Sequence, residues 1–136
     1  MIDTHAHLFA PEIKSDIHQV IERFTRGGGT FIINCAANPQ SCSDVIEQSH
    51  AFPVTIPAVG LHPELAVPGM DDYVRGLDEE WIKKHVVLLE RLLDSHERIC
   101  AIGECGLDYY WLKKERIDDR KKVQMLQREH TAKHQQ

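Results

Sequence analysis

The sequence changes from helix to strand and back to helix within residues 27–39, which read GGGTFIINCAANP. The three glycines end a helix that apolar residues at helical spacing predict over residues 12–26. The apolar run at residues 30–36 then predicts a strand. Asn38 followed by Pro39 is typical of an N-cap with proline in the first turn, and it predicts a second helix to about residue 50.

The same alternation extends over the whole chain. The predicted strands cover residues 1–8, 30–36, 54–59 and 99–104, and the predicted helices cover residues 12–26, 38–50, 78–95 and 118 onward. Pro57 is a mild objection to the third strand, because proline lacks the N–H that a central strand donates. About four β-α units with parallel strands indicate the α/β class, either as a doubly wound open sheet or as part of a TIM (β/α)8 barrel. A complete barrel takes roughly 250 residues, so these 136 residues would supply about half of one.

The composition is that of an ordinary globular protein. The chain has 16 basic and 21 acidic side chains, a net charge of −5, and 42% hydrophobic residues, which excludes disordered and collagen-like classes. No run of about 18 apolar residues is present, and the N-terminus lacks the pattern of a secretory signal. We therefore expect no membrane contact and a cytoplasmic location, with the nucleus as the alternative. The cysteines are expected to be reduced and mostly buried, namely Cys35, Cys42, Cys100 and Cys105.

Charge is distributed unevenly along the chain. Residues 1–111 carry 8 basic and 17 acidic side chains, a net charge of −9, whereas residues 112–136 carry 8 basic and 4 acidic ones, a net charge of +4. The basic segment could contact an anionic partner such as nucleic acid. A solvated amphipathic helix explains the same pattern, and basic helices are common. Charge alone therefore leaves both interpretations open.

Two histidines near the N-terminus, His5 and His7, are the strongest chemical signal. Side chains two apart on a strand point to the same face, so both imidazoles would converge at the C-terminal end of the first strand. Neutral ring nitrogens on a rigid element are suitable ligands for a metal ion. Asp3, on the same predicted face, could support them as a hydrogen-bond partner. The alternative is a pair of histidines that only hydrogen-bond to their surroundings.

Two further polar groups follow later predicted strands. Glu104 ends the fourth strand, where a buried carboxylate is costly unless it is paired or bound to a cation. His62 follows the third strand and could bind a metal, donate a proton or contact a phosphate. Loops after parallel strands carry the active sites of β/α proteins, so both residues are candidates for one site with the two histidines. A surface glutamate and a turn histidine are the alternatives.

These segments together resemble the TatD-type deoxyribonucleases, which are metal-dependent hydrolases with an amidohydrolase-like barrel. The resemblance is carried in the same order by residues 2–8 (IDTHAHL), 60–63 (GLHP) and 102–109 (IGECGLDY). It extends over nearly all of residues 1–136. It implies a partial TIM barrel that forms the N-terminal half of the hydrolase domain.

The resemblance also implies a metal centre and a substrate. His5, His7 and Glu104 would be ligands of divalent cations (Mg²⁺, Mn²⁺ or Zn²⁺), two per complete site, and Glu104 would be catalytic. The remaining site residues would contact the substrate, namely His62, Asp108 and Tyr109. The implied reaction is the hydrolysis of phosphodiester bonds in DNA, often from the 3′ end.

The sequence departs from the family pattern in one respect. The family's other ligands, two histidines and an aspartate, lie on later strands that these 136 residues do not include. His130 and His134 lie in the last predicted helix and not at a strand end, so we assign them no ligand role. The hypothesis is therefore a deoxyribonuclease, or its truncated ligand-bearing half, whose open barrel could self-associate. The alternatives are a silent truncated isoform that acts only by binding, and another amidohydrolase-like hydrolase.

Overall fold

Four parallel strands form a curved sheet in the part of the chain that the structure describes. The computed structural model describes residues 1–67, 69–106 and 125. The strands are β1 (Ile2–Ala6), β2 (Phe31–Cys35), β3 (Thr55–Val59) and β4 (Ala101–Ile102). They lie in the sheet in the order β1-β2-β3-β4, and each neighbouring pair is parallel. The predicted α/β class with parallel strands is confirmed.

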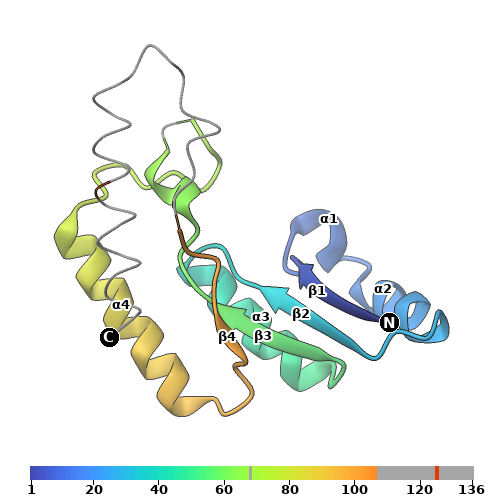
Figure 1. Ribbon diagram of the computed structural model, residues 1–136. Helices are drawn as coiled ribbons and strands as arrows, with labels where there is room; N and C mark the ends of the chain where they lie inside the picture. Colours follow the sequence, from blue (N-terminus) through green and yellow to red (C-terminus); the bar gives the residue numbers. More distant parts are fainter. Residues whose placement is uncertain (68, 107–124, 126–136) are drawn as a thin grey trace.

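Helices connect consecutive strands, and α3 lies against β3 (Figure 1). They are α1 (Pro11–Lys14), α2 (Ile17–Arg26), α3 (Pro39–Ala51), the short 3₁₀ helix η1 (Pro63–Ala66) and α4 (Glu79–Ser95). Crossovers between parallel strands are right-handed, so strands added in sequence order place their connecting helices on one face and curl the sheet. The fold is a partial TIM barrel, as predicted. None of the described helices has the length and apolarity needed to cross a membrane.

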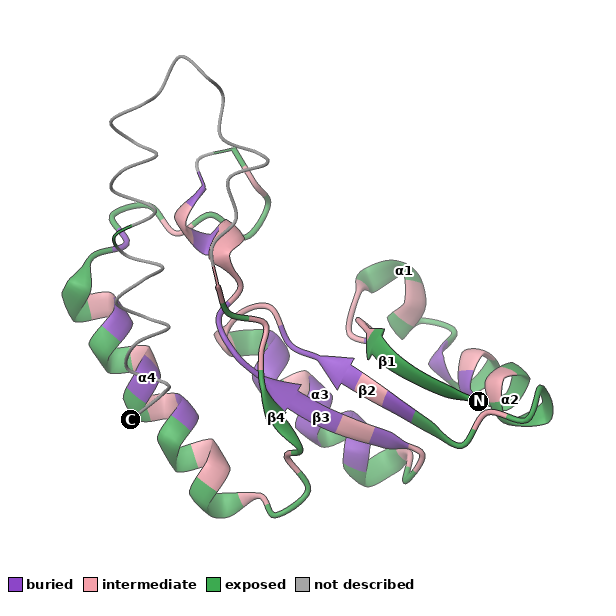
Figure 2. Cartoon of the chain, in the orientation of Figure 1, coloured by how far each residue is buried: buried purple, intermediate pink, exposed green. Residues whose placement is uncertain are grey.

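Two apolar clusters join α2, α3 and α4 to the sheet, in which β2 and β3 are mostly buried and β1 and β4 mostly exposed (Figure 2). In the first, α2 buries Ile17 and Ile21 against Ile32 of β2. The second joins α3 and α4 to the end of β3, and Val45 and Leu89 are almost completely buried in it. The helix predicted over residues 78–95 is confirmed as α4, which buries Ile82, Val86 and Leu89. This packing gives the carboxyl ends of the strands a rigid support.

Side-chain caps set the helix boundaries that the sequence indicated. The Asn38 side chain accepts the Ser41 N–H (2.8 Å), and the Ser41 hydroxyl accepts the Asn38 N–H (2.9 Å), which forms a capping box at the start of α3. Asp78 accepts the Trp81 N–H at the start of α4 (2.8 Å). Gly28, just after α2, has φ of +82°, a conformation that favours glycine. These boundaries confirm the predictions made from Asn38 and the glycine run.

Two predicted elements differ from the structure. The helix predicted over residues 12–26 is divided into α1 and α2, with Ser15 and Asp16 between them. β4 covers two residues and not the predicted 99–104, because it is an edge strand whose register with β3 extends over two pairs. The helix predicted from residue 118 lies outside the described residues.

Pro57 is accommodated within β3 although β3 lies between two strands. Its carbonyl accepts the Cys100 N–H (3.0 Å), just before β4 begins. The N–H and C=O of one strand residue point to the same side. The N–H that Pro57 lacks would therefore face the segment before β4, as its carbonyl does. The proline therefore removes no bond between β3 and the paired residues of β4.

The prediction that the cysteines are mostly buried holds for two of the four. Cys35 and Cys42 are buried, whereas Cys100 and Cys105 are exposed, and all four are free thiols. Cys100 directly precedes the edge strand β4, which has no further strand beside it among the described residues, so its side chain lacks cover. Burial raises the pKa of the Cys42 thiol to about 11, so this group is uncharged at neutral pH.

Candidate metal centre

The carboxyl ends of three strands bring four polar side chains together. His5 lies near the end of β1 and His7 directly follows that strand. His62 follows β3 as the N-cap of η1, and Glu104 follows β4. With neighbours that include Phe9 and Glu64, they line an open pocket of about 340 Å³. The structure thus places the predicted strand-end residues in one site.

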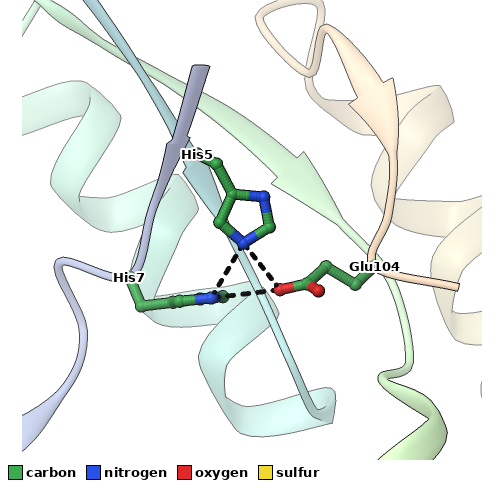
Figure 3. Close-up of side chains that lie close together, drawn as sticks. All are labelled: His5, His7 and Glu104. Carbon is green, nitrogen blue, oxygen red and sulfur yellow. Dashed lines mark hydrogen bonds and ion pairs between the residues drawn. The ribbon is translucent and has the colours of Figure 1, made fainter. Parts of the chain in front are cut away.

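Three ligand atoms form a nearly equilateral triangle at the centre of this site (Figure 3). The Nε2 atoms of His5 and His7 are 3.1 Å apart. The Oε1 atom of Glu104 lies 3.1 Å from the first and 3.0 Å from the second. Neighbouring ligands of one ion at about 2.1 Å are separated by roughly 3.0–3.4 Å in octahedral or tetrahedral geometry. The three side chains therefore fit a single divalent cation.

The tautomer of His7 supports the same conclusion. Its Nδ1 lies 2.8 Å from the Cys35 carbonyl oxygen, which can only accept, so Nδ1 carries the proton. In the neutral ring, Nε2 then presents a lone pair toward Glu104. Metal-binding histidines commonly donate their other N–H to a backbone carbonyl in this way.

The carboxylate of Glu104 lacks a partner for one oxygen. Oε1 is buried and makes no hydrogen bond, although two imidazole nitrogens lie within 3.1 Å of it. A buried carboxylate oxygen without a donor is costly. His5 can donate its single Nε2 proton either to His7 or to Oε1, at 3.1 Å in both cases, and either choice leaves the other acceptor without a donor. A cation between the three atoms would satisfy all of them at once.

The surroundings of His5 differ in part from the prediction. The Asp3 carboxylate accepts the backbone N–H of His5 (3.0 Å), so it supports the strand rather than either imidazole. The register between β1 and β2 shifts between Asp3 and Ala6, which breaks the simple two-residue alternation. The Cys35 sulfur lies 4.0 Å from Nδ1 of His5. Burial, together with the negative charge of Glu104, raises the pKa of the Cys35 thiol and keeps it neutral.

His62 faces the second oxygen of Glu104. Its Nδ1 accepts the backbone N–H of Glu64 (3.1 Å), so the neutral ring carries its proton on Nε2. This Nε2 lies 3.2 Å from Oε2 of Glu104. The arrangement orients the carboxylate so that Oε1 turns toward the two other histidines. The His62 side chain is 19% exposed and also lines the pocket, so a substrate in the pocket could reach it. Its contact with a substrate stays a prediction.

Close backbone packing places Glu104 at the site. The N–H of Gly103 donates to the Val59 carbonyl (2.9 Å), and that of Glu104 donates to the Ala36 carbonyl (3.3 Å). A Cβ atom on Gly60 would collide with the carbonyl group of Gly103 and lie 2.9 Å from the Glu104 nitrogen. Glycine is therefore required for the loop after β4 to approach the end of β3 this closely.

Two predicted site residues lie outside the described part of the chain, and the pocket residues Glu64 and Phe9 were not predicted. Asp108 and Tyr109, the other predicted substrate contacts, lie outside the described residues. Glu64 lines the pocket, with its carboxylate 3.8 Å from Nδ1 of His62, and was not predicted. Phe9 packs edge-on against His7, with ring centroids 5.5 Å apart. Both residues lie two positions from a predicted histidine, which is the sequence signal that could have identified them.

The curved parallel sheet and the donor groups at the strand ends define a TIM-type barrel protein with a candidate metal centre. A family model described as TatD related DNase matches residues 2–135, and the chain belongs to this family. The resemblance in the three sequence segments is thereby confirmed.

Individual relatives agree with this assignment. The chain is 32% identical over 111 residues to the uncharacterized metal-dependent hydrolase YabD of Bacillus subtilis, an alignment that covers 82% of this chain and 38% of YabD. It is 26% identical over 110 residues to human deoxyribonuclease TATDN3, covering 80% and 38% of the two chains. The chain therefore spans less than half the length of the curated relatives that it matches.

Solved structures show the same fold. YJJV, a TatD homologue from Escherichia coli K12, superposes with a TM-score of 0.70 at 25% identity, over 96% of this chain and 44% of that one. A hydrolase TatD family protein from Entamoeba histolytica gives a TM-score of 0.58 at 21% identity, over 96% and 46% of the chains. The second likeness concerns the fold alone.

Proposed function

We propose that the chain is the N-terminal, ligand-bearing half of a metal-dependent hydrolase domain that cleaves phosphodiester bonds in DNA. One observation carries the proposal: a triangle of two imidazole nitrogens and an unpaired, buried carboxylate oxygen, with edges of 3.0 to 3.1 Å. Relatives named as metal-dependent hydrolases and as a deoxyribonuclease support the reaction class. Removal of the terminal nucleotide at the 3′ end is the form of the reaction that we propose.

The residues of this chain would divide the work at the site. His5 and His7 would hold a divalent cation through Nε2, and Glu104 would contribute Oε1 while His62 orients its second oxygen. When bound, such a cation polarises a phosphoryl oxygen and lowers the pKa of a coordinated water. The proposed complement is two cations per complete site, drawn from Mg²⁺, Mn²⁺ and Zn²⁺. Asp108 and Tyr109 are proposed to contact the DNA.

Nuclease activity is expected to depend on Glu104. We expect the chain to shorten 5′-labelled single-stranded DNA in the presence of Mg²⁺ or Mn²⁺, and we expect EDTA to stop the reaction. Glu104→Ala removes the ligand that joins β4 to the two histidines, so cleavage should fall below detection on a sequencing gel. Glu90→Ala, an exposed carboxylate of α4, is the matched control and should retain wild-type rates. Cleavage by the Glu104 variant at the wild-type rate would contradict the proposed role.

The 136-residue chain is also expected to self-associate. β1 and β4 are the edges of the described sheet. Ile2 and its register partner Phe31 are 58% and 47% exposed, and Phe31 lies on the face opposite to the buried Ile32. Exposed apolar side chains beside unpaired strand edges favour association. Size-exclusion chromatography with light scattering should show at least twice the chain mass at micromolar concentration, and a cooperative monomer would contradict this expectation.

A further inference from the structure

A closed ring of hydrogen bonds surrounds the backbone of Leu8, the residue after His7. The Leu8 N–H donates to Oδ1 of Asn34 (2.9 Å), and Nδ2 of Asn34 donates to Oε1 of Gln48 (2.7 Å). Nε2 of Gln48 then donates to the Leu8 carbonyl (3.1 Å). Each of the three residues donates one hydrogen bond and accepts one, so every polar group in the ring has a partner.

The two amide side chains of this ring are buried. Asn34 is completely buried and Gln48 is 8% exposed. Buried polar side chains are costly unless they are fully hydrogen-bonded, and a satisfied network defines one arrangement of the groups that it joins. A carboxylate at either position could not complete the ring, because each side chain must donate one N–H. The chemistry of both residues is therefore specific to holding the Leu8 backbone.

The ring lies directly behind the candidate metal ligand. The Leu8 N–H belongs to the peptide group that joins His7 to Leu8, so Asn34 fixes the backbone on the C-terminal side of His7. The next residue of β2, Cys35, accepts the Nδ1 proton of the His7 ring (2.8 Å). Adjacent residues of one strand thus hold both the backbone and the ring of the same histidine.

We infer that Asn34 and Gln48 are positioning residues for the metal centre. They hold the peptide group after His7 so that its Nε2 points to the position shared with His5 and Glu104. The inference rests on the proposed metal-dependent function and extends it to two residues of β2 and α3 that contact none of the ligand atoms. Partners that orient a metal ligand typically alter metal affinity when they are changed.

The test uses Gln48→Met in the whole chain, with Mn²⁺ as the probe. Methionine keeps the volume but removes both of the bonds that Gln48 contributes to the ring. We expect about tenfold weaker Mn²⁺ binding by calorimetry, as for other residues that support a ligand. We also expect an altered electron paramagnetic resonance spectrum of the bound ion at saturation. The spectrum reports the geometry at the ion, which a loss of stability alone would not change.

Two further variants make the test decisive. Val45→Ala creates a cavity in the same helix, where Val45 is fully buried, and leaves the ring intact, so it should lower stability while keeping wild-type affinity and spectrum. Gln48→Glu keeps an oxygen that accepts from Asn34 but replaces the N–H that donates to the Leu8 carbonyl with a second carboxylate oxygen. It is the test variant if Gln48→Met does not fold.

The outcomes are distinguishable. Wild-type affinity and spectrum in a folded Gln48 variant, or an equal loss in Val45→Ala, would overturn the inference while leaving the metal centre in place. A wild-type chain that binds no Mn²⁺ would overturn the proposed function, and this inference with it.

Discussion

Replacing His5 with alanine is expected to abolish the binding of Zn²⁺ or Mn²⁺ by this chain. The described residues offer three ligand atoms within reach of one another, and His5 supplies one of them. With three protein ligands, the wild-type affinity is expected to be modest, and two ligands would leave most of the coordination shell to water. In the variant, only Nε2 of His7 and Oε1 of Glu104 would remain as ligand atoms, 3.0 Å apart, and each would still present a lone pair to the other.

Isothermal titration calorimetry measures this loss directly. His5→Ala should show no binding heat above dilution, while the wild-type chain gives a saturable isotherm. His50→Ala is the matched control, because it removes an exposed imidazole that belongs to α3 and not to the site. Equal heats from the wild type and His5→Ala would rule out the metal centre described above.

The second large effect is expected from a single added methyl group, in Gly60→Ala. The new Cβ would collide with the carbonyl of Gly103, so the loop that carries Glu104 must move away from β3. Forced overpacking of this kind typically costs about 1–3 kcal/mol. Because Oε1 lies about 3 Å from both histidine nitrogens, displacement of the loop should break the triangle and remove metal binding as well.

Thermal unfolding and calorimetry would report the two consequences separately. We expect a lower Tm for Gly60→Ala and no saturable binding of Zn²⁺ or Mn²⁺. Gly103→Ala is the control, since a Cβ at that position meets nothing within 4 Å and no positive φ restricts it. A Gly60 variant with wild-type stability and affinity would show that the two loops are not packed as the structure has them.

Much of the fold could be predicted because each local signal agreed with the next. The glycines at residues 27–29, the cap at Asn38 and the apolar spacing of α4 each specify an element through interactions between near neighbours in sequence. Parallel strands in sequence order then place all carboxyl ends on one edge. This is why His5, His7 and Glu104 could be expected in one place although almost a hundred residues separate the first from the last.

The failures came from features that depend on neighbours across the sheet. The short β4 and the exposure of Cys100 reflect an edge position, which the apolar run at residues 99–104 does not encode. The shift in register between Asp3 and Ala6 depends on how β1 pairs with β2. The alternation that placed Asp3 beside the histidines assumes a regular strand, and the shift in register means that β1 is not regular between Asp3 and Ala6.

The sequence by itself determined the order of strands and helices, the family, and the residue types that could bind a cation. Tertiary structure decided how those groups present their atoms: the Cys35 carbonyl selects the proton position on His7, and the approach of Gly60 brings in Glu104. Likewise, Asn34 and Gln48 meet across the Leu8 backbone only after β2 and α3 have packed. Hydrogen bonds and close contacts act over about 3 Å, so partners far apart in sequence are defined only when the chain has folded.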